Sequence, residues 1–264
     1  MQPVRTLERL NYKLTPASIN SYYRCPRKFQ FRYIRNVKMP FEFGPALAIG
    51  SVAHKALAEM FRWRRDERAV ASVESHVTPF LLKERYPPGS GDSLRTEHLP
   101  IIMDHVEAAL RALPVEVQIV DIEREFDYSF RNSMIGEEVT IASRVDLVIR
   151  HGGGIVDHID FKTGSQGGDP IQNFLSRVTV MNHIDAPGEQ VRTVNVLTRT
   201  GMYDVVPSAR EAHVHIWDIV RGAIRDLSAD TEWAPRPEPA ICRWCDFRSI
   251  CDQAQLDDDG RYDN

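Results

Sequence analysis

Asp146, Asp160 and Lys162 lie in two consecutive segments that alternate apolar and polar residues, which is the pattern of half-buried strands. In the segment TIASRVDLVIR, Asp146 falls on the face opposite Val145 and Leu147. In the segment GIVDHIDFK, Asp160 and Lys162 are two residues apart and therefore share a face. The sequence HGGG between the segments predicts a turn, and pairing of the two strands could bring Asp146 beside Asp160.

Two adjacent carboxylates repel each other unless a cation neutralises them, and oxygen ligands of this kind suit Mg²⁺ or Mn²⁺. Such an ion stabilises charge on a phosphate and lowers the pKa of an attacking water, which a neighbouring lysine can position. Asp146, Asp160 and Lys162 are therefore candidate catalytic residues for the hydrolysis of phosphodiesters. Glu123 and Glu125 are both candidates for a further acid, because both lie on the polar face of the segment VQIVDIEREFDYSF.

The chain has four cysteines, of which Cys242, Cys245 and Cys251 lie in the segment ICRWCDFRSICD and Cys25 lies near the N-terminus. A disulfide is not expected in the reducing cytoplasm, so this usage favours a metal site with four thiolate ligands. The spacing C-x2-C-x5-C with one remote partner allows either zinc or a [4Fe–4S] cluster. Zinc ribbons usually take their ligands from two C-x2-C pairs, which fits this spacing poorly. Either group would tie the N-terminal helix to the C-terminal segment.

The composition, 42% hydrophobic and 27% charged, is that of an ordinary globular protein. No segment approaches the roughly 18–20 apolar residues that span a bilayer. The N-terminus has no apolar core of a secretory signal, so we expect a cytoplasmic protein. The net charge of −4 is uneven, because residues 1–70 contain 14 Lys/Arg against five Asp/Glu, which leaves +9 there and −13 in the remainder. This basic third predicts contact with a polyanion.

Part of the basic charge lies in the segment 22–35, where aromatic residues stand between the basic ones. Basic side chains neutralise phosphates and aromatic rings can stack on bases, so the segment predicts a nucleic-acid contact, although the aromatic residues also suit a core. The residues expected to bind nucleic acid here are Arg24, Arg27, Lys28 and Arg32. The phosphate-binding pattern GxxxxGK[ST] does not occur, so this chain has no helicase motor of its own.

The elements that must position these residues are helices followed by an α/β set. Thr15 and Pro16 are typical of a helix start, whereas the turn residues of FEFGPALAIGS (41–51) indicate a loop. In the strand that begins at 117, Val120, Ile122 and Phe126 are expected on one apolar face. The expected elements are helices at 15–37, 52–69, 71–113 (broken by a loop at 85–93), 170–184 and 208–226, and strands at 117–130, 140–150, 154–162 and 190–198.

A single domain over residues 1–264 is the simplest interpretation, because no repeat or low-complexity segment occurs. Within it we expect a mainly helical part at 12–115 and a catalytic α/β core at 117–228. A cysteine segment at 236–252 and a disordered acidic tail at 253–264 are expected to follow.

The pattern D-x(13)-D-F-K-T-G, preceded by a strand that carries glutamate, resembles the PD-(D/E)XK nuclease superfamily. The stretch GSVAHKAL and the cysteines look like the RecB/AddB-type branch, which is similar to the iron–sulfur exonucleases of CRISPR adaptation. In that branch, a helix with the pattern G-[ST]-x-x-H-x-x-[LF] carries a metal-binding histidine, which His54 matches here. The resemblance runs from Thr15 to Cys251.

The resemblance implies a restriction-endonuclease-like α/β fold with a central mixed sheet flanked by helices. It implies that His54, Asp146 and Asp160 hold Mg²⁺ or Mn²⁺, that Lys162 assists the attacking water and that Glu123 is a further catalytic acid. It also favours a structural [4Fe–4S] cluster over zinc at the four cysteines, as a link between the N- and C-terminal regions.

Two positions depart from the pattern of the family. Ser143 stands where a glycine usually precedes the first aspartate, and the DNA-contacting motif Q-x-x-x-Y is represented by Gln172 followed by Ser176. The expected function is hydrolysis of DNA at ends or in single strands, in DNA repair, recombination or CRISPR and phage defence. The expected partner beside DNA is a separate helicase or a recombination or adaptation protein. Two other classes stay open: a non-catalytic iron–sulfur subunit that binds DNA ends beside a helicase, and a zinc-stabilised interaction module.

Overall fold

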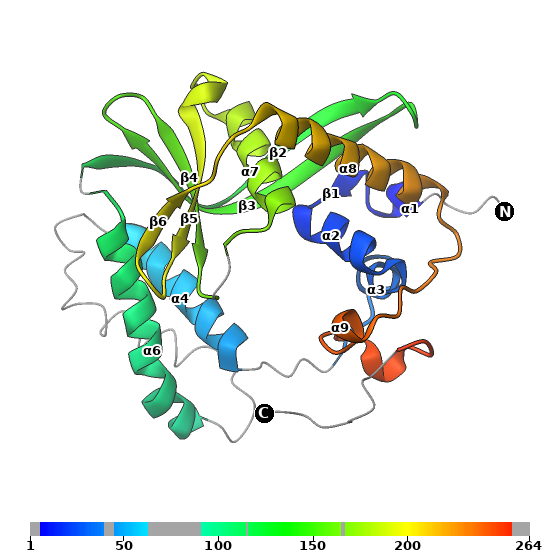
Figure 1. Cartoon of the computed structure of the whole chain (residues 1–264), viewed down its shortest axis with the longest axis horizontal. Coiled ribbons are helices and arrows are strands. Elements are labelled where there is room, and N and C mark those ends of the chain that lie inside the picture. The colour runs from blue at the N-terminus through cyan, green and yellow to red at the C-terminus, as the bar shows by residue number, and fades with distance from the viewer. Residues whose placement is uncertain (1–5, 40–44, 63–90, 115, 165–166, 255–264) are drawn as a thin grey trace. The chain divides into compact units, whose positions relative to one another are not determined.

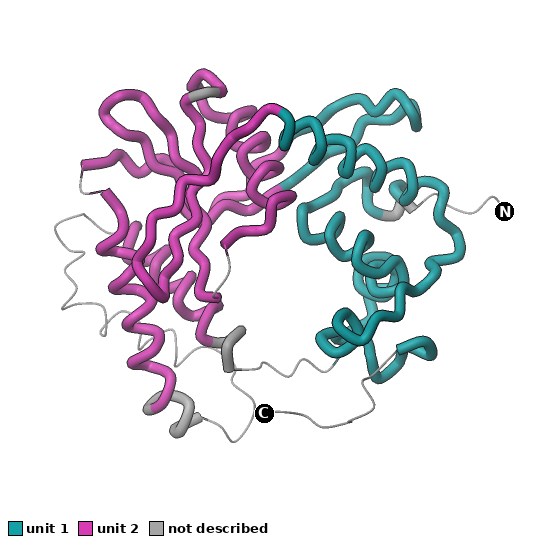
Figure 2. Tube along the Cα trace, viewed as in Figure 1, with its two compact units in different colours: residues 1–41, 128–142, 211–264 teal, residues 42–127, 143–210 magenta. Residues whose placement is uncertain are grey.

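The computed structural model describes residues 6–39, 45–62, 91–114, 116–164 and 167–254 (Figure 1). The chain forms two compact units (Figure 2). Unit 1 contains residues 1–41, 128–142 and 211–264, and unit 2 contains residues 42–127 and 143–210. Neither unit is a continuous half of the sequence, and the single domain expected from the sequence stays a prediction.

Unit 2 is built on a mixed β-sheet. β3 (Glu137–His151), which enters unit 2 at residue 143, pairs antiparallel with β4 (Val156–Lys162). β4 pairs parallel with β5 (Val191–Leu197), and β5 pairs antiparallel with β6 (Met202–Val205). β2 (Val117–Asn132) pairs with β3. The parallel strands β4 and β5 are joined by α7 (Pro170–His183) and the 3₁₀ turn η4 (Gly188–Gln190), since parallel neighbours need a crossover connection.

Helices cover both faces of this sheet. On one face, α4 (Pro45–Arg62) and α6 (Gly91–Ala112) form a core with β3, β4 and β5. On the other face, Val180 of α7 packs with Phe126 and Val148. The predicted α/β class with a mixed sheet between helices is therefore confirmed. The buried residues of the larger core are Val52, Ala53, Ala56, Leu57, Met60, Phe61, Ile102, Val106, Ala109, Leu147, Ile149, Ile159, Phe161, Val194 and Val196.

The apolar residues of β2 do not share one face. Ile122 packs against the core of α4 and α6, whereas Val120 and Phe126 pack in the α7 core. Glu123 has a left-handed φ of +52°, which interrupts the regular alternation of side chains as a β-bulge does. The predicted common face of Val120, Ile122 and Phe126 is therefore wrong.

The helical part before the sheet begins earlier than the sequence suggests. α4 starts at Pro45, so the predicted loop at 41–51 is wrong for residues 45–51. Proline suits the first turn of a helix because an N–H there would have no partner within the helix. The predictions at 63–90 and for the acidic tail from 255 onward lie outside the described residues. No described helix is both long enough and apolar enough to cross a bilayer.

Unit 1 joins the two ends of the described chain. α1 (Thr6–Arg9) and β1 (Lys13–Leu14) precede α2 (Pro16–Arg24), and β1 pairs parallel with the beginning of β3. The Tyr22 hydroxyl donates a hydrogen bond to Asp230 at 3.0 Å, after α8 (Arg210–Ala229). The Tyr23 hydroxyl donates to the carbonyl of Ile219 within α8 at 2.6 Å. These contacts hold the N-terminal helices against α8.

The predicted helix at 15–37 is broken at Cys25. α2 ends at Arg24, α3 (Pro26–Phe29) begins at Pro26, and the π-helical turn η1 (Gln30–Ile34) follows. Cys25 is extended, with φ −162° and ψ 110°, because a proline ring disfavours the helical conformation of the residue before it. One continuous helix is thus a wrong prediction, and the break takes the Cys25 backbone out of the helical path.

Candidate active site

β3 and β4 separate where the predicted acidic residues lie. The register of the two strands ends at the pair Leu147–Ile159, so Asp146 and Asp160 are the next residues on the two strands. The Asp146 carboxylate accepts a hydrogen bond from the N–H of Phe161 at 2.8 Å. The Asp146 side chain thus accepts the hydrogen bond that a backbone carbonyl of β3 would accept in a regular ladder. Both aspartates lie where the pairing of β3 with β4 ends, which we call the opening of the sheet.

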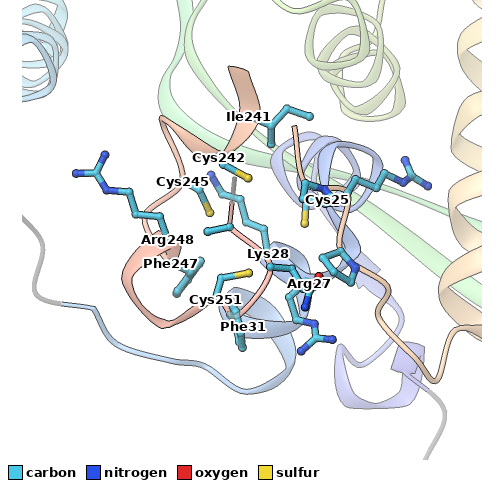
Figure 3. Close-up of a pocket in the computed structure, with 15 residues that line it drawn as sticks. Cys25, Arg27, Lys28, Phe31, Ile241, Cys242, Cys245, Phe247, Arg248 and Cys251 are labelled. Carbon is cyan, nitrogen blue, oxygen red and sulfur yellow. The ribbon is translucent and has the colours of Figure 1, made fainter. Parts of the chain in front are cut away.

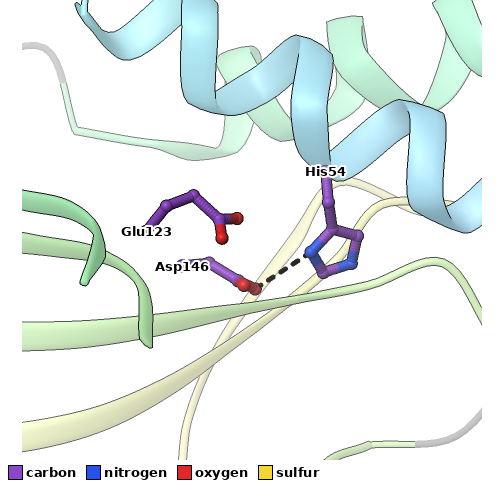
Figure 4. Close-up of side chains that lie close together, drawn as sticks. All are labelled: His54, Glu123 and Asp146. Carbon is purple, nitrogen blue, oxygen red and sulfur yellow. Dashed lines mark ion pairs between the residues drawn. The ribbon is translucent and has the colours of Figure 1, made fainter. Parts of the chain in front are cut away.

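His54 reaches the same place from α4. Its Nδ1 lies 3.3 Å from Oδ2 of Asp146 (Figure 4). One turn earlier, Gly50 allows α4 to approach the end of β4 closely, because a Cβ there would lie only 2.9 Å from Oγ1 of Thr163. Leu57, one turn after the histidine, is fully buried in the core and fixes the helix against the sheet.

Glu123 completes a group of three candidate metal ligands. One ligand atom from each of His54, Glu123 and Asp146 lies within 4.8 Å of the others (Figure 4). Glu125, the other acid considered from the sequence, is exposed and does not belong to this group. The left-handed backbone at Glu123 accounts for the difference between the two acids, because it breaks the alternation that would give them the same environment.

Asp160 and Lys162 form the other side of the site. Nζ of Lys162 forms an ion pair with Oδ2 of Asp160 and donates a hydrogen bond to Oε1 of Gln172 at 3.3 Å. Gln172 lies in the first turn of α7, where its N–H is capped by Asp169 at 2.9 Å. Oδ2 of Asp160 is buried, and the Lys162 ammonium is its partner.

The pKa values of the site residues are shifted because several acidic side chains lie close together. Burial, and next the charge of Asp146, raise the pKa of Asp160 to about 6. Burial also acts to raise the pKa of Asp146, but the hydrogen bonds with His54 and the Phe161 N–H outweigh it and lower that pKa. Burial acts to lower the pKa of His54, yet Asp146 raises it overall. Burial and then Asp146 raise the pKa of Glu123. A cation would relieve this repulsion.

The donor set fits a hard divalent cation. Carboxylate oxygens with one imidazole suit Mg²⁺ or Mn²⁺, and the candidate ligands supply both kinds of donor atom. Within the described part of the chain, the close group contains His54, Glu123 and Asp146, whereas Asp160 lies outside it. The predicted ligand set of His54, Asp146 and Asp160 therefore overlaps with the observed group without being identical to it.

All four cysteines line one pocket in unit 1 (Figure 3). Cys25 lies between α2 and α3, Cys242 ends α9 (Pro239–Cys242), Cys245 follows in a turn, and Cys251 follows the 3₁₀ turn η5 (Arg248–Ile250). All four are free thiols, and burial raises the pKa of Cys245. Four sulfur atoms around one pocket form a donor set that fits zinc or an iron–sulfur cluster.

The basic residues predicted to bind nucleic acid are partly used within unit 1. Arg32 pairs with Asp246, and Nζ of Lys28 lies 4.0 Å from the same carboxylate. Arg27 donates a hydrogen bond to a backbone carbonyl of the C-terminal segment at 3.1 Å. Arg24 is exposed. Most of the neighbouring aromatic residues are buried, as the interpretation of a core suggests.

Arg144 and two buried asparagines near the site were not predicted from the sequence. Nε of Arg144 donates a hydrogen bond to Oε2 of Glu123 at 2.8 Å, and its place on the same strand face as the first aspartate was the available signal. Asn173 and Asn195 are buried, each with an Oδ1 that has no hydrogen-bond partner. A Cβ on Gly168 would lie 2.5 Å from both oxygens, so the close approach of this loop requires glycine.

Comparison with known proteins places this geometry in context. Residues 13–252 match the family model of the PD-(D/E)XK nuclease superfamily. No curated protein matches the sequence. A solved structure described as "Crystal structure of SSO0001" is 14% identical, with 95% of this chain and 93% of that chain covered and a TM-score of 0.43.

Proposed function

Because the chain belongs to the PD-(D/E)XK nuclease superfamily, we propose that it is a metal-dependent deoxyribonuclease whose reaction takes place between Asp146, Asp160 and Lys162. The observation that carries the proposal is the opening of the sheet at the two aspartates. Their side chains are only 15% and 16% exposed, so water compensates their charges poorly. Two weakly hydrated carboxylates side by side are explained by a cation that binds between them.

The metal-binding residues would be Asp146 and Asp160, with His54 and Glu123 as further ligands. The family uses divalent ions such as Mg²⁺ or Mn²⁺, which stabilise charge on phosphate and activate water when bound. Asp146 is already oriented by the Phe161 N–H, so little rearrangement is needed for its carboxylate to bind a cation.

Lys162 would act on the attacking water and on the phosphate. Its ammonium is held by Asp160 and Gln172, which restrict it to one region of the site. From there it can donate a hydrogen bond to the attacking water or to a phosphate oxygen as negative charge develops. Gln172 would therefore contribute by positioning the lysine, in addition to the contact with DNA that the family pattern implies.

The test is degradation of end-labelled linear DNA by the purified protein in the presence of Mg²⁺ or Mn²⁺. We expect cleavage that chelation abolishes and that is lost in Asp160→Ala and Lys162→Ala. Asp127→Asn is the matched control, because Asp127 is half exposed and lies outside the site. Full activity in both active-site variants would overturn the assignment of these residues.

The finer proposal is an exonuclease of the RecB/AddB type that acts on ends or single strands in DNA repair, recombination or CRISPR and phage defence. It is supported by the pattern around His54 and by the four cysteines. Linear and closed circular single-stranded DNA of the same sequence separate the two modes of cleavage. Degradation of the linear form alone supports an exonuclease, whereas equal cleavage of both forms overturns it.

At the cysteines we propose a structural [4Fe–4S] cluster held by Cys25, Cys242, Cys245 and Cys251. The support is the arrangement of all four thiols around one pocket. Anaerobic purification followed by iron, sulfide and zinc analysis tests it. A brown protein with iron and sulfide is expected, whereas a colourless protein that holds zinc would exclude the cluster. A brown protein that binds DNA ends without cleaving them would instead favour the non-catalytic subunit beside a helicase.

A further inference from the structure

Each acid of the candidate site has its own cationic or imidazole partner. His54 pairs with Asp146, Lys162 pairs with Asp160, and Arg144 pairs with Glu123. The first two partners have proposed roles in metal binding and in catalysis. Arg144 has none, and it is the most exposed of the three, with 69% of its side chain accessible against 29% for the histidine and 19% for the lysine.

The ion pair of Arg144 joins a buried acid to an exposed base. The side chain of Glu123 is 18% exposed, and its carboxylate shares the ligand group with His54 and Asp146. The strained left-handed backbone of Glu123 holds its carboxylate in this position although the residue is not a glycine. The guanidinium of Arg144 thus neutralises a candidate metal ligand from the solvent side, where a DNA strand would approach.

We infer that Arg144 exchanges partners during substrate binding. Without metal, its guanidinium neutralises Glu123; once a divalent ion takes over that carboxylate, the guanidinium binds a phosphate of the DNA. This inference rests on the proposed function. It follows from charge, because a divalent ion attracts the carboxylate about twice as strongly as a guanidinium at the same distance. It follows also from geometry, because the guanidinium fork matches phosphate as well as carboxylate.

The exchange couples two binding events. A metal ion that releases Arg144 makes one more phosphate contact available, so metal and DNA must each increase the affinity for the other. A residue with a purely structural role would affect DNA binding to the same extent with and without metal. The dependence of the Arg144 effect on metal is therefore the signature of the exchange.

The first test is the affinity for Mn²⁺ by calorimetry, without DNA. Arg144→Gln removes a cation that competes for Glu123, so we expect Mn²⁺ to bind roughly three- to tenfold more tightly, a modest effect because the arginine is exposed. Arg150→Gln is the matched control: it lies on the same strand, about 20 Å away, where Arg150 contacts the carbonyl of Asp185. We expect no change in this control.

The second test is the affinity for a phosphorothioate single-stranded oligonucleotide, which resists cleavage, as a function of salt. With Mn²⁺, we expect Arg144→Gln to bind more weakly and to lose about 0.7 from the slope of log affinity against log salt, which corresponds to one phosphate contact. With a chelator present, we expect wild type and Arg144→Gln to bind equally. Arg144→Lys keeps the charge and should retain the slope while it loses part of the affinity.

The outcomes separate the inference from the proposed function. Wild-type protein that binds no Mn²⁺ would overturn the metal-dependent nuclease and the exchange together. Wild-type protein that binds Mn²⁺, with an unchanged Mn²⁺ affinity in Arg144→Gln, would overturn the exchange alone. Equal weakening of DNA binding with and without Mn²⁺ would also overturn it. Circular dichroism of Arg144→Gln is expected to match that of wild type, because the replaced side chain is exposed.

Discussion

The carboxylate site of unit 2 and the cysteine pocket of unit 1 have opposite kinds of support. Asp146 and Asp160 extend from strands of a sheet that is packed between helices on both faces. Cys242 ends a helix of four residues, and Cys251 follows a turn of three. Such short elements do not hold their own geometry without tertiary support.

This difference in support indicates which site is formed before its ion binds. The carboxylates are positioned by hydrogen bonds and ion pairs inside a core that does not need the metal. The cysteine segment lies against the N-terminal helices around the pocket that its thiols share, with the ion pair of Arg32 and Asp246 as a further contact. We therefore expect loss of the first ion to abolish activity and loss of the second to lower stability.

The largest expected effect is on activity at the carboxylate site. Asp160→Asn removes a charge that the proposed metal requires, so we expect cleavage to fall about 10³-fold or more. The melting temperature and the iron content should stay unchanged, since the cysteine pocket is not altered. Initial rates of DNA degradation measure the activity, and a thermal melt with iron analysis measures the stability and the iron content. Asp127→Asn is the control. A large drop in melting temperature would contradict the claim that this site is preformed.

The second effect concerns the cysteine pocket. Cys245→Ser removes one of four sulfur ligands, and we expect the free energy of unfolding to fall by about 3 kcal/mol or more because the bound group is weakened or lost. Denaturant unfolding together with metal analysis measures this. Ser249→Ala, at an exposed position in the same segment, should leave both quantities unchanged. Unchanged stability of Cys245→Ser would mean that the short elements hold their geometry alone.

The third prediction tests the polar support of unit 2. The side chain of Asp157 is fully buried, and it accepts hydrogen bonds from Arg192 at 2.6 and 2.7 Å and from Tyr203. Burial acts to raise the pKa of Asp157, but the hydrogen bonds from Arg192, Tyr203 and His151 together outweigh it and lower that pKa. Asp157→Asn leaves Arg192 without its counter-charge, and because Arg192 is 34% exposed and remains partly solvated we expect a loss of about 2–3 kcal/mol at pH 7.

The dependence of this loss on pH follows from the direction of the shift. A depressed pKa in the folded state stabilises the fold above the ordinary aspartate pKa of about 3.9 and ceases to do so as pH falls through the folded value. The difference between wild type and Asp157→Asn should therefore be largest at neutral pH and shrink below about pH 4. Urea unfolding across this range measures it, and a difference that grows toward acid pH would disprove the sign.

The smallest effect is expected at Gly168. Gly168→Ala places a Cβ against the buried amides of Asn173 and Asn195, and we expect a loss of about 1–3 kcal/mol from overpacking. Because the same loop leads to Asp169 and Gln172, cleavage should also fall, by less than in Asp160→Asn. Gly167→Ala is the control, since nothing lies near a Cβ at that position. Equal stability of the two variants would contradict the predicted overpacking, because it would show that the asparagine side chains can move aside at little cost in free energy.

Residue patterns alone indicated the strands β2 to β5, α7 and the two aspartates at neighbouring strand positions, because these depend on local periodicity and on one short turn, whereas the mixed sheet was implied by the resemblance. The break at Cys25 could also have been predicted, since Pro26 restrains the residue before it. The choice of Glu123 over Glu125 could not be made, because a left-handed glutamate in a strand leaves no signal in its residue type. The pairing of Arg144 with Glu123 likewise depends on contacts between separate strands.

Each unit is made of separate stretches of the chain, so the protein cannot be cut into two fragments that each contain one unit. Unit 1 takes both ends of the chain and residues 128–142 between the two halves of unit 2 (Figure 2). A fragment of residues 42–210 would retain the carboxylate site but would carry a hairpin without its packing partners. Truncation is therefore a poor way to isolate the activity. The turn at 133–136, where Met134 is 57% exposed, is instead a suitable position to insert a fluorescent or affinity label without cutting either unit.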